Sequence, residues 1–330
     1  MRVLLVSSFP PRHCGIGAYA AVQAERLRAK GHEVTVLSPP DGLGDVRVPF
    51  LGGRPFRAAV RLGRNADRIV VHFQPALYFR PRAPLSKVVT SLSLWWLCLR
   101  RRRIEVLIHE ADTPRRWRPD YLLLAAAFRA APVLLFHTAA ERDRLEREYR
   151  VHVRARLIDH REGVRVAVRL SRQDARHRLG LPPQGTVFVV PGFIHPDKGA
   201  ERAAAAIGPA GRLYVVGSVK DRTPRNLAYL ERLRDQAART ERVELVERYL
   251  EEDELDAWVA AADAVVLPYR RSWSSGALAR AQALGVPAIV TSVGGLAEQA
   301  GPQDVVVEDD AALARAMAAV SPDRAGAPGR

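Results

Sequence analysis

The chain has 330 residues, of which 48% are hydrophobic. This length predicts two domains, and this composition excludes general disorder. The formal net charge of +15 favours an anionic partner: nucleic acid, an anionic membrane or a phosphorylated substrate. Alternatively, the basic residues only form a solvated surface.

Short apolar runs alternate along the chain with longer segments of helical pattern. The runs are continuously apolar instead of alternating with polar residues, which is typical of parallel strands covered by helices on both faces. The expected strands are residues 2–8, 33–38, 68–74, 104–110 and 133–138, then 187–193, 212–218, 243–250, 264–269 and 287–292. Two such series predict an α/β protein of two doubly wound, Rossmann-like parallel-sheet domains.

A charged stretch with little strand pattern separates the two series and ends in Pro182-Pro183-Gln184-Gly185. We therefore expect an N-terminal domain over residues 1–165 and a C-terminal domain over 166–320. Residues 321–330 are rich in Pro, Gly, Ala and Arg and are expected to form a disordered tail.

The first expected strand leads through Cys14 into Gly15, Ile16 and Gly17, where a helical pattern begins. Glycines between a strand and a helix let backbone N–H groups approach an anion. The dinucleotide-binding fingerprint is absent, because Ala20 stands in place of its third glycine. An ordinary tight turn is the alternative interpretation of this loop.

Residues 85–99 carry apolar side chains at helical spacing, and four arginines, Arg100 to Arg103, follow directly. A basic amphipathic helix with tryptophans could lie on an anionic membrane surface. Alternatively, the helix packs on the N-terminal sheet and the arginines form a solvated tail.

Three further segments follow expected strands and could carry chemistry. His109 ends a buried-looking strand, and the carboxyl ends of such strands face the ligand crevice of open α/β sheets. Lys198 stands at a predicted helix entrance in a chain that has only four lysines, so it could place a mobile charge on an anion. Ser274, Ser275 and Gly276 precede a helix, where they could cap it or hold a phosphate.

Together, these segments resemble the retaining, nucleotide-sugar-dependent glycosyltransferases of the GT-B fold, family four, of the glycosyl transferases group 1 type. The matching stretches are Pro-Pro-Arg-His-Cys-Gly-Ile-Gly, Val-Leu-Ile-His-Glu, Pro-Gly-Phe-Ile-His-Pro-Asp-Lys-Gly, Ala-Asp-Ala-Val-Val-Leu-Pro-Tyr and Gly-Val-Pro-Ala-Ile-Val-Thr-Ser-Val-Gly-Gly-Leu-Ala-Glu. They follow the family's order along the chain. The resemblance implies two Rossmann-like domains facing a central cleft, the N-terminal domain binding the acceptor and the C-terminal domain the nucleotide sugar.

The resemblance also assigns roles to single residues. Gly15, Ile16 and Gly17 look like the loop that approaches the donor diphosphate, and Lys198 looks like the basic residue that binds it. His109 looks like the histidine beside the donor sugar, so His109 and Lys198 are the catalytic candidates. The remaining donor-binding candidates are Ser274, Ser275, Gly276, Arg280 and Glu298.

Three of this chain's residues depart from the family pattern in a way that changes the charge at the site. Phe193 replaces a diphosphate-binding arginine, and Ser272 and Arg280 occupy the positions of the family's two glutamates. A guanidinium only donates hydrogen bonds, so Arg280 cannot accept them from a ribose. We expect Arg280 to turn toward the diphosphate and replace the cation lost at Phe193; the alternative is that it points into solvent.

The resemblance implies transfer of a hexosyl group from a nucleoside diphosphate sugar to an acceptor hydroxyl with retention of configuration. No metal site and no cofactor beyond the donor are expected. The expected partners are the nucleotide sugar and a saccharide or lipid-linked acceptor, not nucleic acid, for which no binding motif is present. We expect a cytoplasmic protein, because the two cysteines, Cys14 and Cys98, are far apart in the sequence and we expect neither a signal peptide nor an apolar run of membrane-spanning length. Peripheral contact at the inner membrane face is left open. A catalytically degenerate GT-B protein acting as a binding or partner subunit is the alternative function.

Overall fold

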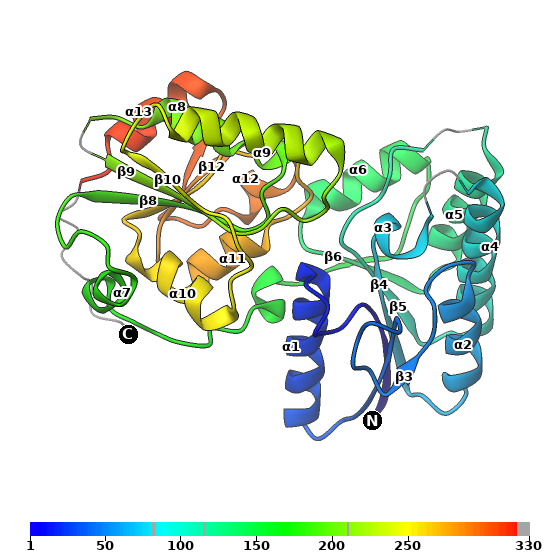
Figure 1. The fold of residues 1–330 in the computed structure, drawn as a ribbon. Helices are drawn as coiled ribbons and strands as arrows, with labels where there is room; N and C mark the ends of the chain where they lie inside the picture. The colour runs from blue at the N-terminus through cyan, green and yellow to red at the C-terminus, as the bar shows by residue number, and fades with distance from the viewer. Residues whose placement is uncertain (81–82, 115–116, 210, 322–330) are drawn as a thin grey trace. The chain divides into compact units, whose positions relative to one another are not determined.

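A computed structural model describes residues 1–80, 83–114, 117–209 and 211–321. The chain divides into two compact units, Met1–Gly163 (unit 1) and Val164–Arg330 (unit 2), and each contains one parallel sheet (Figure 1). Apart from Ser321, the predicted C-terminal tail lies outside the described residues.

Unit 1 contains a seven-stranded sheet in the order β3-β2-β1-β4-β5-β6-β7. Its strands are β1 (Arg2–Val6), β2 (Glu33–Ser38), β3 (Val46–Arg47), β4 (Arg68–Phe73), β5 (Ile104–Ile108), β6 (Val133–Phe136) and β7 (Ala155–Leu157). Its helices are α1 (Gly15–Ala29), α2 (Arg54–Leu62), α3 (Pro75–Tyr78), α4 (Pro84–Arg100), α5 (Pro119–Ala130), α6 (Ala139–Tyr149) and the 3₁₀ turn η1 (His160–Gly163). Figure 1 shows α1 on one side of this sheet and α2 and α4 on the other.

Unit 2 contains a six-stranded sheet in the order β10-β9-β8-β11-β12-β13. Its strands are β8 (Thr186–Pro191), β9 (Gly211–Val216), β10 (Val243–Val246), β11 (Ala264–Leu267), β12 (Ala288–Thr291) and β13 (Val305–Val307). Its helices are α7 (Arg172–Leu179), η2 (Pro196–Lys198), α8 (Ala200–Ala206), α9 (Pro224–Ala237), α10 (Glu252–Ala261), α11 (Gly276–Ala283), α12 (Leu296–Gln299) and α13 (Asp310–Ala318). One core cluster joins the sheet to α8, α9 and α13, and another joins it to α10, α11 and α12.

The expected fold class is confirmed, since each unit is a parallel sheet covered by helices on both faces. All ten expected strands are present, most of them ending one to four residues earlier than expected. The three strands that were not expected, β3, β7 and β13, lie at sheet edges and have two or three residues each. All residues of β7 are exposed, so it lacks the apolar run that marks a buried strand.

The strand orders place a reversal point in each sheet. In unit 1 the chain moves outward from β1 to β2 and β3 and then returns to β4 on the other side of β1. In unit 2 the same reversal occurs between β8 and β11. Open α/β sheets bind ligands beyond the carboxyl ends of strands at such a point. The loops that follow β1, β4, β8 and β11 are therefore the expected positions of a ligand site.

Among the helices that the structure describes, we find none with the length and apolar character that crossing a membrane requires. The longest described helix, α4, has a strongly apolar sequence.

Candidate functional site

In unit 2, two of the predicted site segments follow β8 and β11, the strands on either side of the reversal point. Lys198 ends η2, which follows β8, and Ser274 to Gly276 follow β11 and lead into α11. The sequence predicted these segments separately, without a contact between them. Their strands are neighbours in the sheet, so the topology brings the two loops to the same edge.

Tyr269 connects Lys198 to Ser275. The Lys198 ammonium nitrogen lies 3.7 Å from the centre of the Tyr269 ring, a cation–π arrangement. The Tyr269 hydroxyl lies 3.3 Å from the Ser275 hydroxyl. Tyr269 is almost fully buried, so its ring is a fixed support for a side chain that is otherwise mobile. The contact orients the Lys198 charge beside the loop that carries Ser275.

Ser275 itself is held by Gln299 and acts as a helix cap. Its backbone N–H donates to the Gln299 side-chain oxygen at 2.9 Å, and the Gln299 side-chain nitrogen donates to the Ser275 carbonyl at 2.7 Å. The Ser275 hydroxyl accepts from the backbone N–H of Leu278 at 3.2 Å. Of the two alternatives for this loop, the capping role of Ser275 is confirmed. Its amide is already used by Gln299, so a phosphate at this loop would depend on other donors.

Gly199 brings the two loops of unit 2 into contact. Its backbone is left-handed, with φ of 64°, and a Cβ at this position would lie 2.2 Å from the Pro268 carbonyl oxygen. Arg202 reinforces the approach by donating to the carbonyls of Pro268 and Tyr269 at 2.9 and 3.2 Å. A glycine is therefore required directly after Lys198, both for its conformation and for the space.

The structure gives Arg280 partners that differ from the expected ones. Arg280 is buried, and its guanidinium pairs with the carboxylates of Glu252 and Asp256, both on α10. It also donates to the Arg165 carbonyl at 3.3 Å. The expectation that Arg280 turns toward a diphosphate is therefore wrong, and so is the solvent-facing alternative. The buried carboxylate of Asp256 needs a cation, and Arg280 supplies it.

Glu298 lies in α12 and is exposed. The Gly-Gly turn before α12 packs against the loop that follows β11. Gly295 donates its N–H to the Trp273 carbonyl at 2.7 Å, and a Cβ on Gly294 would lie 2.0 Å from the Ser272 carbonyl oxygen. This turn thus places α12, with Glu298 and Gln299, beside the Ser274–Gly276 loop.

In unit 1, Gly15, Ile16 and Gly17 form the first turn of α1, directly after the loop that follows β1. Gly17 is buried, and a Cβ there would touch the backbone of Phe9 at 3.4 Å, whereas a Cβ on Gly15 would meet nothing within 4 Å. Cys14 is the N-cap residue, and its thiol accepts a contact from the Ser8 hydroxyl at 3.4 Å. The helix start has the predicted position, and its binding of an anion stays a prediction.

His109 belongs to a cluster of four histidines around Tyr19 of α1. The rings of His72, His109, His137 and His160 lie with their centres 5.3–5.7 Å from the Tyr19 ring. They come from β4, from the ends of β5 and β6, and from η1. Gly163 closes the cluster, since a Cβ there would enter the Tyr19 ring. His109 was predicted from its place at a strand end; the partners that surround it were not.

Hydrogen bonds through this cluster determine which nitrogen of His109 carries its proton. The Gln23 side-chain oxygen lies 2.9 Å from Nε2 of His72, so this nitrogen is the donor. A neutral imidazole has one donor and one acceptor, which makes Nδ1 of His72 an acceptor. Nε2 of His109 lies 3.1 Å from that atom and donates to it. The remaining nitrogen of His109, Nδ1, is therefore an acceptor.

Burial keeps three of the cluster's histidines, His72, His109 and His137, neutral. Burial lowers the pKa of His72 to about 3, with a smaller contribution from His137. It also lowers the pKa of His137 to about 4, although the Ile158 carbonyl and Asp159 act in the opposite direction. The pKa of His109 falls well below its usual value because of burial and then the neighbouring histidines. Near neutral pH, His109 is not a cation and cannot neutralise a diphosphate.

Two polar atoms in the cluster have no hydrogen-bond partner: the buried hydroxyl of Tyr19 and Nε2 of His137. Burial raises the pKa of Tyr19, so its hydroxyl keeps its proton. Among the described residues, no group of three or more His, Cys, Asp or Glu side chains is positioned to hold a metal ion. The four histidines therefore form a packed cluster, in which His72, His109 and His137 are neutral near pH 7.

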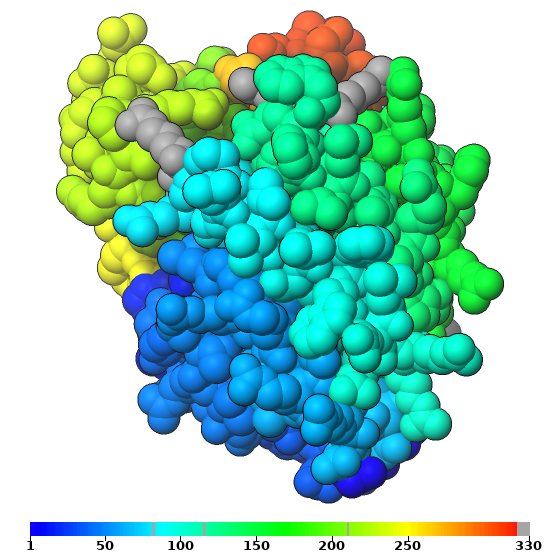
Figure 2. All heavy atoms as spheres, turned by 90° about the vertical axis from the view of Figure 1, so that its right-hand side faces the viewer, coloured from blue at the N-terminus to red at the C-terminus, as the bar shows by residue number. Residues whose placement is uncertain are grey.

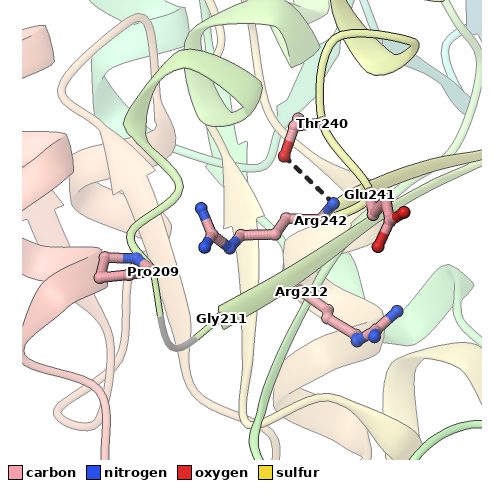
Figure 3. Close-up of a pocket in the computed structure, with 6 residues that line it drawn as sticks. All are labelled: Pro209, Gly211, Arg212, Thr240, Glu241 and Arg242. Atoms are coloured by element: carbon pink, nitrogen blue, oxygen red, sulfur yellow. Dashed lines mark hydrogen bonds between the residues drawn. The ribbon is translucent and has the colours of Figure 1, made fainter.

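A surface pocket of about 380 Å³ lies at the other end of the second sheet, at the start of β9 and β10 (Figure 3). It is lined by Pro209, Gly211, Arg212, Thr240, Glu241 and Arg242. The backbone N–H of Arg242 donates to the Thr240 hydroxyl at 3.2 Å. The amino ends of the strands are remote from the reversal-point loops, so we do not assign this pocket to the candidate site.

Several residues of the site have weak signals in the sequence. Tyr269 ends the expected strand 264–269 and belongs to one of the matching stretches, which gives it no role of its own. Gln299 follows Glu298 without a motif of its own, and His72 lies within an apolar strand. Their roles depend on which strands are neighbours, which no local pattern reveals.

Comparison with known proteins shows that residues 186–323 match the glycosyl transferases group 1 family. D-inositol 3-phosphate glycosyltransferase 1 of Catenulispora acidiphila is 33% identical over 223 residues, which are 61% of this chain and 51% of that protein. A second D-inositol 3-phosphate glycosyltransferase, from Streptomyces bingchenggensis, is 33% identical over 190 residues and is covered over 39% of its length. The chain thus matches about half or less of the length of these relatives.

Solved structures extend the similarity to both units. Sucrose-phosphate synthase of Thermosynechococcus elongatus superposes with a TM-score of 0.73 at 19% identity, covering 96% of this chain and 89% of that one. HepE of Anabaena in complex with UDP-glucose superposes with a TM-score of 0.68 at 15% identity, covering 96% and 89%. The chain has the GT-B fold, and residues 186–323 of its second unit are similar to the glycosyl transferases group 1 family.

Proposed function

We propose that this protein is a glycosyltransferase that moves a hexosyl group from a nucleoside diphosphate sugar to an acceptor hydroxyl with retention of configuration. The observation that carries the proposal is the position of Lys198, Tyr269 and Ser275 at the reversal point of a sheet that matches the glycosyl transferases group 1 family. This arrangement puts an oriented cation where such sheets bind their ligands.

Lys198 is the residue to which we assign the donor diphosphate. Cleavage of the sugar–phosphate bond leaves a diphosphate whose negative charge grows in the transition state, and a preoriented cation stabilises that charge. The Tyr269 ring holds the ammonium in place before the donor arrives, so little reorganisation is needed. We do not include Arg280 among the donor-binding residues, because both of its carboxylate partners would have to be given up.

We assign His109 a different kind of role. As a neutral ring whose Nε2 donates to His72, it offers Nδ1 as an acceptor for a hydroxyl of the substrate. It orients the substrate through a hydrogen bond and does not counter charge. In this scheme the leaving diphosphate accepts the proton of the acceptor hydroxyl, and no metal or further cofactor takes part. Gly15, Ile16, Gly17, Ser274, Gly276 and Glu298 remain predicted donor contacts.

The first experiment is a thermal-shift screen of the full chain against nucleotide sugars. Uridine and adenosine diphosphate sugars come first, because solved structures of the same fold hold UDP, UDP-glucose and ADP. A ligand that binds only the folded state raises the apparent melting temperature. Transfer from the stabilising donor is then assayed with an acceptor panel that includes D-inositol 3-phosphate and lipid-linked saccharides. NMR of the product reports whether the anomeric configuration is retained.

The decisive variant is Lys198→Ala. Loss of one charge-assisted contact is worth about 1.5–3 kcal/mol, so donor affinity and transfer should fall roughly ten- to hundredfold. Lys30→Ala is the matched control, since Lys30 is an exposed lysine at the far end of α1. Unchanged kinetics in Lys198→Ala would remove Lys198 from the proposed site.

The alternative, a catalytically degenerate GT-B protein that acts as a binding or partner subunit, is motivated by Ser272 and Arg280 at the positions of the two glutamates. The same experiments separate the two functions. Donor binding without transfer or donor hydrolysis, over the whole acceptor panel, would support the degenerate protein.

A further inference from the structure

Helix α4 of unit 1 exposes its most apolar face. Leu85, Val89, Leu92, Trp96 and Leu99 are all exposed, from 38% for Trp96 to 80% for Leu85. They follow one another at intervals of four and three residues, so at 3.6 residues per turn they form one stripe about 80° wide and about 21 Å long. We call these five residues the α4 stripe.

The opposite face of α4 is the one that packs against the protein, and half of its residues carry hydroxyl groups. Its buried residues are Thr90, Ser91, Ser93, Leu94, Leu97 and Cys98. Thr90 and Ser93 donate their hydroxyls to carbonyls one turn earlier, both at 2.7 Å, which satisfies them within the helix. Small side chains also allow a close approach to α2, since a Cβ on Gly53 would lie 2.2 Å from the Ser93 hydroxyl oxygen. A helix that serves only the core of a soluble domain buries its apolar face instead.

The positive charge of the chain is concentrated in the part of the sequence that contains this helix. Residues 47–103 contain 12 arginines and Lys87 against a single acidic residue, Asp67. Their net charge of +12 accounts for most of the +15 of the whole chain. Arg54, Arg61 and Arg64 on and after α2 are exposed, as are the arginines at 100, 102 and 103.

Charge and apolar surface occur on the same side of unit 1. The Arg100 guanidinium lies 5.8 Å from the Trp96 ring centre, at the end of the α4 stripe. Figure 2 shows the segments of α2, in blue, and α4, in cyan, adjoining on the face turned toward the viewer. Leu62 at the end of α2 adds another exposed apolar side chain. The patch offers an apolar strip bordered by arginines.

We propose that this face of unit 1 docks on an anionic lipid surface. An occupant that satisfies both parts of the patch must be apolar along the stripe and negatively charged beside it, which the boundary between lipid headgroups and acyl chains provides. Tryptophan at one end of the stripe and long arginine side chains beside it are typical of helices that lie in this boundary. Since no described helix meets the requirements for crossing the membrane, the contact is peripheral. The patch shares no residue with the proposed donor site.

The test is co-sedimentation of the full chain with vesicles of phosphatidylglycerol and phosphatidylcholine, compared with vesicles of phosphatidylcholine alone, in low-salt buffer and without donor or acceptor. We expect binding to the anionic vesicles only, loss of that binding at high salt, and a blue shift of tryptophan fluorescence that Trp96→Phe diminishes. Failure to sediment with the anionic vesicles at low salt overturns the proposal. Because no sugar substrate is present, this result is independent of the proposed activity.

The double variant Leu92→Gln/Trp96→Gln should weaken vesicle binding at least tenfold while retaining the thermal stability of the parent. The matched control is Leu43→Gln/Leu157→Gln, which changes two exposed leucines outside the patch and should bind like the parent. Equal binding by the two double variants overturns the proposal. Sedimentation analysis tests whether a second copy of the chain covers the stripe instead. A parent protein that does not bind vesicles but forms a dimer, which Leu92→Gln/Trp96→Gln abolishes, also overturns the proposal.

Discussion

At the scale of single residues, Arg280 shows how a departure from a family pattern acquires a structural role. Its guanidinium neutralises Asp256, whose side chain is fully buried and whose other carboxylate oxygen accepts from the backbone N–H groups of Ala167 and Val168. The cluster fixes the segment that opens unit 2 onto α10 and α11. A buried carboxylate that loses its cation retains the full cost of its desolvation.

We therefore expect Arg280→Met to destabilise unit 2 by about 3–5 kcal/mol, the range measured when one partner of a buried ion pair is removed. Arg280→Glu should also be destabilising, because it adds a third carboxylate to the cluster. Urea unfolding measures the change. Arg248→Met is the control, since Arg248 pairs with Glu254 at the surface and its loss should cost less than about 1 kcal/mol. Similar costs for the two arginines would contradict a structural role for Arg280.

The hydrogen-bond chain from Gln23 through His72 to His109 leads to a second residue-scale prediction. Gln23→Leu removes the acceptor that fixes the His72 tautomer, so Nδ1 of His109 is no longer held as an acceptor. We expect kcat to fall severalfold with little change in the KM for the donor, because the diphosphate contacts are untouched. Gln23→Glu keeps an acceptor oxygen and should retain most of the activity. Nitrogen-15 NMR of the histidine rings reports the tautomers directly. An unchanged His109 tautomer in Gln23→Leu would refute the proposed hydrogen-bond chain from Gln23 to His109.

At the scale of elements, the contact between the loops after β8 and β11 depends on Gly199. Alanine at this position must adopt a left-handed backbone and also displace the Pro268 carbonyl. Gly180 has nearly the same φ, 66°, with nothing within 4 Å of an added Cβ. The pair of glycines thus separates the conformational cost from the steric one.

We predict that Gly180→Ala costs roughly 1–2 kcal/mol of unfolding free energy, which is the left-handed backbone alone. Gly199→Ala should cost more and should also weaken donor binding, because the loop that carries Tyr269 must move away from Lys198. Thermal unfolding and donor titration of both variants measure the two effects. Donor affinity unchanged in Gly199→Ala would show that the loop contact is not part of the donor site.

At the scale of the whole molecule, the histidine cluster makes the stability of unit 1 depend on pH. His72 and His137 have pKa values near 3 and 4 in the folded protein, against 6.5 for an unperturbed histidine. Between these values the unfolded chain binds more protons than the folded one, so the free energy of unfolding falls as the pH falls. The stabilisation is complete above about pH 7 and is lost progressively below it.

Between pH 7.5 and pH 5, each of these two histidines should lower the free energy of unfolding of unit 1 by about 2 kcal/mol. Urea unfolding at a series of pH values tests this. His137→Gln keeps a donor for the Ile158 carbonyl and should reduce the slope by up to one proton. His152→Gln, at a fully exposed histidine outside the cluster, is the matched control. A stability that does not vary between pH 5 and 7.5 would contradict the burial of a neutral cluster.

The sequence by itself determined ten of the thirteen described strands and the fold class, because buried parallel strands are continuous apolar runs that need no knowledge of their neighbours. It also located Lys198, His109 and the Ser274–Gly276 loop, since each follows such a run. Only the tertiary structure decided that Lys198 and Ser275 share Tyr269, that His109 is neutral within a histidine cluster, and that Arg280 pairs with Asp256. It also decided that α4 turns its apolar stripe outward. These facts depend on contacts between segments far apart in the chain, on burial that shifts proton affinities, and on which face of a helix meets its neighbours, none of which a local pattern specifies.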